Sequence, residues 1–102
     1  MALCLADSLI KMKRLDQIDL KNEFINWFLE GKNNPFASDE ERENKCSVGL
    51  GGNIQMSLKE FMDNSSIGAT QSGDKNTNGC GSIMRLAPIP IFYHNKSFDE
   101  AI

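Results

Sequence analysis

The sequence predicts a small all-α protein. Apolar residues recur at three- and four-residue steps in several segments, and no alternating strand pattern stands out. Polar stretches rich in Gly, Asn and Ser separate these segments, as loops separate helices. The chain has 102 residues, of which 40% are hydrophobic and 25% charged, as in an ordinary globular protein. We expect about four helices and two glycine-rich loops around one small core.

Two helices are expected before the first polar loop. The first covers residues 1 to about 13, where apolar side chains follow the helical period but no capping residue precedes them. The second runs from about Asp16, a suitable N-cap, to Glu30. Gly31 can adopt the left-handed conformation that ends such a helix. The expected buried face of the second helix consists of Leu20, Phe24, Trp27 and Phe28.

A loop and a third helix should follow. Residues 32–46 are polar and contain Pro35, a composition typical of loops. The segment Gly49–Asn53 should then open a helix that runs to about Met62. Its expected buried stripe consists of Ile54, Leu58, Phe61 and Met62.

The second long loop precedes a fourth helix. Residues 63–79 are rich in Ser, Asn, Gly, Thr and Asp and lack an apolar period, and loops of this length are often functional. A helix should start near Gly81, and Pro88 and Pro90 must bend or interrupt it. Its apolar residues are Ile83, Met84 and Leu86.

Both ends of the chain are expected to be cut. An apolar helical stripe begins at the first residue without a cap, and Ser97 with Glu100 forms a capping box that should start another helix. The chain stops at Ile102, less than one turn later, and so short a helix is not stable alone. We therefore expect residues 1–102 to be a partial domain, truncated at both ends.

The charge balance argues against nucleic-acid and membrane partners. The formal net charge is −3, whereas nucleic-acid binders usually carry a basic face. We interpret the basic run Lys11–Arg14 and the acidic run Asp39–Glu41 as solvated surface. No segment approaches the roughly 20 apolar residues that a membrane span needs.

The cysteines indicate a reduced compartment. Cys4, Cys46 and Cys80 show no paired spacing, which argues against a disulfide framework. His94 is the single histidine, too few for a zinc site with these cysteines. We therefore expect a cytoplasmic location.

Three glycine-rich segments could bind phosphate, and two of them lack the known nucleotide-binding motifs. The segment Gly68–Lys75 lacks the Gly-Lys-Ser/Thr ending of a P-loop, because Asp74 precedes Lys75 and Asn76 follows it. The segment Gly49–Asn53 does not have the dinucleotide fingerprint. It can be a flexible helix start that needs unusual backbone angles, or an anion site at a helix N-terminus.

A third segment, residues 77–88, places small residues at the start of a helix. Backbone N–H groups there could face an anionic ligand, and Asn78 and Ser82 could bond hydroxyl groups. Arg85 lies among apolar residues and would need a partner if buried. Cys80 has no base close in sequence, so a packing role is favoured over a nucleophilic one. The alternative for the whole segment is a tight loop with close helix packing.

Four segments in order together resemble the ADP-ribosylglycohydrolase family. Asn78–Pro88 is similar to a family region containing Asn-Gly, Met-Arg and Pro. Met1–Leu9 is similar to the helix after the first metal motif, and Phe24–Gly31 to an aromatic helix ending in glycine. Val48–Asn53, with Leu58, is similar to the segment that opens the next helix. The resemblance covers nearly the whole chain.

The resemblance implies an all-α fold with a two-magnesium site that hydrolyses a glycosidic bond of ADP-ribose. The family's ligands lie in a Thr-Asp-Asp motif and an Asp-x-Asp-Thr/Ser motif, and neither is present in residues 1–102. Asp63, Asp74 and Asp99 do not occupy matching positions. Magnesium is thus expected for the family, with no ligand and no catalytic residue assigned in this chain.

The resemblance also implies substrate contact. Arg85 and Pro88 are assigned structural roles. The loop expected beside ADP-ribose, or beside an ADP-ribosylated substrate, contains Ser72, Gly73, Asn78, Gly79, Cys80, Gly81 and Ser82.

Three functions follow from these observations. The first is a fragment of a magnesium-dependent hydrolase that cleaves the bond between ADP-ribose and a protein side chain or small molecule. Such a fragment is expected to be inactive alone, because it lacks the metal motifs. The alternatives are a non-catalytic module that binds ADP-ribose or a nucleotide, and a helical interaction remnant.

Overall fold

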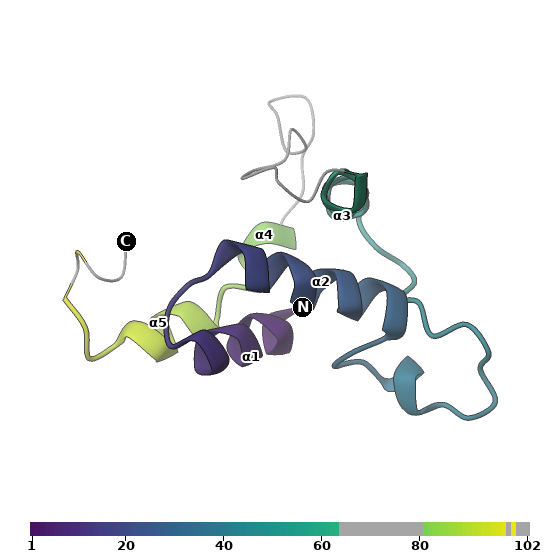
Figure 1. Ribbon diagram of the computed structural model, residues 1–102, viewed down its shortest axis with the longest axis horizontal. Helices are drawn as coiled ribbons and strands as arrows, with labels where there is room; N and C mark the ends of the chain where they lie inside the picture. Colours follow the sequence, from purple (N-terminus) through teal and green to yellow (C-terminus); the bar gives the residue numbers. More distant parts are fainter. Residues whose placement is uncertain (64–80, 98, 100–102) are drawn as a thin grey trace.

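The architecture is helical throughout the part of the chain that can be described. A computed structural model describes residues 1–63, 81–97 and 99, and within them the regular elements are helices, with no strand. This confirms the predicted fold class. The elements, shown in Figure 1, are α1 (Ala2–Met12), α2 (Gln17–Glu30), the 3-10 helix η1 (Pro35–Ser38), α3 (Gly52–Asp63), α4 (Gly81–Met84) and α5 (Pro88–Tyr93). In these residues, no helix is both long enough and apolar enough to cross a membrane.

The ends of α2 are set by local chemistry, as the sequence predicts. Asp16 precedes the helix in an extended conformation, and its Oδ1 accepts a hydrogen bond of 2.9 Å from the Asp19 N–H. This bond satisfies one of the backbone donors that a helix start leaves unpaired. Gly31 follows the helix with φ +71° and donates its N–H to the Asn26 carbonyl. Helix α1 likewise ends in a left-handed residue, Lys13, with φ 59°.

The predicted fourth helix is divided in two before Pro88. Helix α4 ends at Met84, and two turn hydrogen bonds bridge the break, Leu86 N to Ile83 O (3.1 Å) and Ile89 N to Leu86 O (2.9 Å). Pro88 is the first residue of α5, where a missing N–H costs little. The helix expected after Ser97 falls on residues 98 and 100–102, which lie outside the described residues.

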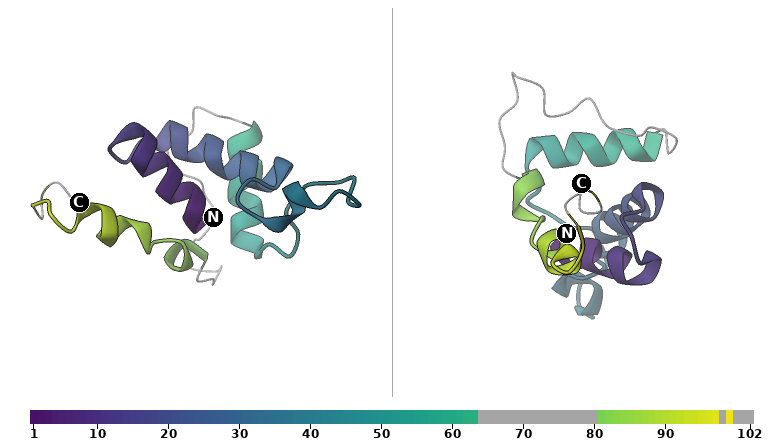
Figure 2. Two further views of the ribbon diagram at one scale, coloured as in Figure 1. Left: turned by 90° about the horizontal axis from the view of Figure 1, so that it is seen from below. Right: turned by 90° about the vertical axis from the view of Figure 1, so that its left-hand side faces the viewer.

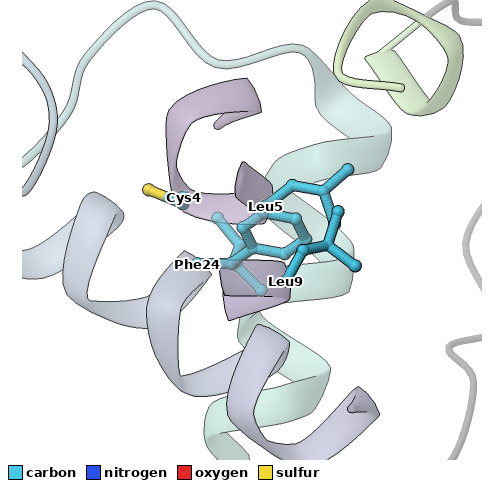
Figure 3. Packing of buried hydrophobic residues seen from close by; sticks show 5 residues of the cluster. Cys4, Leu5, Leu9 and Phe24 are labelled. Atoms are coloured by element: carbon cyan, nitrogen blue, oxygen red, sulfur yellow. The ribbon is translucent and has the colours of Figure 1, made fainter. Parts of the chain in front are cut away.

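One apolar cluster joins the first three helices. Helices α1 and α2 pack side by side, and α3, seen end-on in Figure 1, crosses α2 at a steep angle, as Figure 2 also shows. Figure 3 shows the ring of Phe24 among the side chains from α1. Partly buried Ile89, Phe92 and Tyr93 extend the cluster onto α5. The buried members of the cluster are Cys4, Leu5 and Leu9 from α1, Phe24 from α2 and Leu58 from α3.

The expected buried stripes are confirmed in part. Leu20, Trp27 and Phe28 are only partly buried but pack against the cluster, as do Ile54 and Phe61. The prediction that Met62 is buried is wrong, since 41% of its surface is exposed. Phe61 in the last turn of α3 packs against the cluster, and Lys21 Nζ of α2 lies 5.0 Å from the centre of its ring. Met62 follows about 100° further around the helix and lies at the edge of the buried face.

The polar segment after α2 folds back onto that helix. Ser47 donates its N–H to the Phe28 carbonyl (2.8 Å) and its hydroxyl to the Trp27 carbonyl (2.6 Å). Asn34 in turn donates to the Ser47 hydroxyl at 2.7 Å. Two of the last carbonyls of α2, which helix geometry leaves without a partner in the helix, are thereby paired. The segment predicted as a loop is thus held against the α2 end and includes η1.

Gly31→Ala should destabilise the protein by about 2 kcal/mol or more, because an L residue with this φ is strained. The new Cβ would also lie 2.6 Å from the Lys45 carbonyl oxygen and 3.0 Å from the Ala37 nitrogen. Urea unfolding followed by circular dichroism measures the change. Gly52→Ala is the matched control, since no heavy atom lies within 4 Å of that Cβ position. Equal losses for both variants would contradict this account.

Candidate functional site

The substrate loop expected from the sequence is described only at its end. Ser72, Gly73, Asn78, Gly79 and Cys80 lie outside the described residues. Gly81 and Ser82 begin α4, as predicted. Their contact with a substrate stays a prediction.

The residue after α4 connects this segment to the core. The Arg85 guanidinium carbon lies 5.4 Å from the centre of the Phe24 ring, and Phe24 is only 5% exposed. The aromatic face supplies the partner that a half-buried cation needs, and burial lowers the pKa of Arg85. The group remains protonated, because an arginine pKa starts far above neutral pH. This geometry supports the structural role predicted for Arg85.

The other glycine-rich segment opens α3, as expected. Gly49 has φ +73°, a conformation that favours glycine. The Gln55 N–H donates to the Gly51 carbonyl (3.0 Å), so the helix starts directly after Gly51. No heavy atom lies within 4 Å of a Cβ built on Gly51 or Gly52. The need for glycine at position 49 supports the interpretation as a helix start, and the open space leaves the anion-site alternative available.

A charged cluster that the sequence analysis missed links α1 to α2. Lys11 Nζ lies 2.6 Å from Asp19 Oδ1 and 3.1 Å from Glu23 Oε1, and Lys32 pairs with the other oxygen of Glu23. The side chain of Glu23 is only 7% exposed, whereas Lys11 is 53% exposed. The prediction that Lys11 is at the surface holds, but its ion pairs were not foreseen. The sequence does contain a signal for these ion pairs: Asp19 and Glu23 are four residues apart, which puts both carboxylates on one face of the helix.

The electrostatics of this cluster favour a structural role. The hydrogen bond from Lys11 is the largest cause that lowers the pKa of Asp19. Hydrogen bonds to Asp19 and then Glu23 raise the pKa of Lys11, and Glu23 raises that of Lys32. Each of these three shifts favours the charged form, so Lys11, Asp19 and Lys32 stay ionised near neutral pH. A general acid or base needs the opposite, a pKa moved toward the working pH.

Of the cysteines in the described residues, Cys4 belongs to the buried apolar cluster, whereas Cys46 is only partly buried. Cys4 is fully buried, and Cys4 and Cys46 are free thiols. Asn33, in the left-handed conformation, donates to Asp7 at 2.8 Å and approaches Cys4 Sγ at 3.5 Å. The cytoplasmic location expected from the cysteine pattern stays a prediction.

The described side chains do not fit a magnesium ion. In residues 1–63, 81–97 and 99, no group of three or more His, Cys, Asp or Glu side chains could hold a metal. We therefore derive no step of a reaction through a metal from these residues.

Comparison with known proteins gives a family for the chain. The ADP-ribosylglycohydrolase family profile matches residues 1–102. The curated protein ADP-ribosylarginine hydrolase Tri1 of Pseudomonas putida (strain GB-1) is 32% identical over 92 residues, which are 90% of this chain. The chain spans only 22% of that relative's length. No solved structure matches it significantly.

Asp19→Asn should destabilise the protein at neutral pH, and the loss should disappear in acid. The folded protein lowers the pKa of Asp19 below its ordinary value of 3.8, so the ionised carboxylate is the stabilising form. Its contribution is therefore present above about pH 3.8 and is lost as the pH falls through the lower, folded-state value. Urea midpoints measured from pH 7 downward test this. Glu43→Gln, at an exposed loop carboxylate, should show no such pH-dependent difference. An Asp19→Asn difference that persists at the lowest pH would contradict the assignment.

Proposed function

The chain belongs to the ADP-ribosylglycohydrolase family, and we propose that it forms part of a magnesium-dependent hydrolase. The substrate would be ADP-ribose linked through a glycosidic bond to a protein side chain or a small molecule. The match of the family profile along residues 1–102 carries the proposal. Because the chain spans 22% of its curated relative, the reaction is proposed for a complete domain of this family.

The proposed contribution of this chain is to bind and orient the substrate. The loop that contains Ser72, Gly73 and residues 78–82 would lie against ADP-ribose. Two observations support this role: α4 begins at Gly81, and Arg85 is held over the buried ring of Phe24. Attaching the end of a binding loop to the core lowers the entropic cost of ordering the loop when a ligand binds.

Magnesium, when bound in a complete domain, would activate water and orient the substrate. The residues of this chain would have no share in holding it, since the family's metal motifs are absent from the sequence. The name of the relative points to arginine as the acceptor, and ADP-ribosyl-arginine is therefore the substrate to test first.

The decisive experiment places this chain in a whole domain. In the P. putida relative, the 92-residue matched stretch is replaced by residues 1–102, and hydrolysis of ADP-ribosyl-arginine is measured with magnesium and with a chelator. Asn78→Ala should lower kcat/KM by about 2- to 10-fold, the effect of one lost hydrogen bond. Asn22→Ala, an exposed change on α2, should leave kcat/KM unchanged.

The possible outcomes separate the candidate functions. A folded chimera that neither hydrolyses nor binds ADP-ribose would refute the proposal. A folded chimera that binds ADP-ribose in a calorimetric titration, but does not hydrolyse the substrate, would favour the non-catalytic binding module. Circular dichroism establishes folding in each case.

A further inference from the structure

An apolar groove lies between α1 and α5. Its volume is about 370 Å³, and every residue that lines it is apolar. Helices α1 and α5 contact each other along this line, and Tyr93 at the end of α5 accepts a hydrogen bond of 3.2 Å from the Leu15 N–H. The groove is therefore formed by two helices that are attached to each other. Its lining includes Ala2, Leu3, Ala6 and Ile10 of α1 and Pro88 and Ile91 of α5.

Large side chains of this groove are exposed to solvent. Leu3 is 63% exposed, Ile10 68% and Ile91 70%. Water contact with apolar surface is unfavourable, and clustered exposure of this kind typically marks an interaction surface. Within the described residues, no other element covers these three side chains.

The shape and chemistry of the groove suit an apolar helix. Ala2 and Ala6 are one turn apart on the same face of α1, where their small side chains leave room for a close approach. Bulky residues at positions 3, 10 and 91 can pack against the ridges of an incoming helix. No charged or hydrogen-bonding side chain lines the groove, so nothing in it would recognise a polar ligand.

We propose that the groove receives an apolar helix from the part of an ADP-ribosylglycohydrolase domain that lies outside the stretch matched by this chain. The chain corresponds to 22% of its relative, so most of that protein lies outside the matched stretch. An entirely apolar lining is typical of helix contacts within one core, whereas non-obligate interfaces between separate proteins mix apolar and polar area. The proposal rests on family membership and does not depend on the catalytic proposal.

The test uses the whole 102-residue chain as bait. The two segments of the P. putida relative that flank the matched stretch are each expressed as a fusion to a soluble protein and titrated onto the immobilised chain. At least one segment should bind. The double variant Ile10→Gln and Ile91→Gln should weaken that binding at least 10-fold.

Ile18→Gln is the matched control. Ile18 is also 70% exposed, but it lies on α2 and does not line the groove. Glutamine is a good helix former and is uncharged, so the helix dipole neither favours nor opposes it. All variants should keep the helical content of the wild type, which circular dichroism verifies, and the control should bind as the wild type does.

Three results would overturn the proposal. The first is that neither flanking segment binds. The second is that Ile18→Gln weakens binding as much as the groove variants do. The third is that the chain alone sediments as a dimer and that the groove substitutions dissociate this dimer. The occupant of the groove would then be a second copy of this chain.

Discussion

The packing of the Phe24 ring is the constraint on which the rest of this structure depends. The ring lies among Leu5 and Leu9 of α1, belongs to the same buried cluster as Leu58 of α3, and carries the Arg85 guanidinium on its face. One side chain thus connects helices from both halves of the chain. Replacing Phe24 by a smaller residue would remove apolar contacts with α1 and α3 and, at once, the aromatic face that Arg85 contacts.

Two sets of polar contacts hold the helices around this ring in place. The ion pairs of Lys11 and Lys32 with the buried carboxylate of Glu23 hold α1 and the end of α2 together. Ser47 pairs the Trp27 and Phe28 carbonyls near the end of α2 and attaches the following segment. The opposite side of α1 has no such cover in the described residues and forms the apolar groove with α5. Helix α1 therefore has one face in the core of this chain and one face available to another helix.

Much of the fold could be predicted because its signals are local. Asp16 and Gly31 delimit α2 through bonds within a few residues, and Pro88 marks the break before α5, where a proline is tolerated at the first helical position. The candidate site was less predictable. The loop itself was inferred by resemblance to a family, whereas the contact of Arg85 with Phe24 joins residues far apart in sequence. The exposure of Met62 was missed because helical spacing gives the direction of a buried face but not its width.

The sequence by itself determined the helical class, the caps, the breaks and the family of this chain. Each depends on residue type at short spacing, or on ordered motifs that need no coordinates. Only the tertiary structure decided that the half-buried Arg85 lies over the Phe24 ring, that Lys11 pairs with Asp19 and Glu23, and that α1 and α5 form a groove. These features depend on the relative placement of helices, which results from the packing of all side chains together and is not encoded in any one segment.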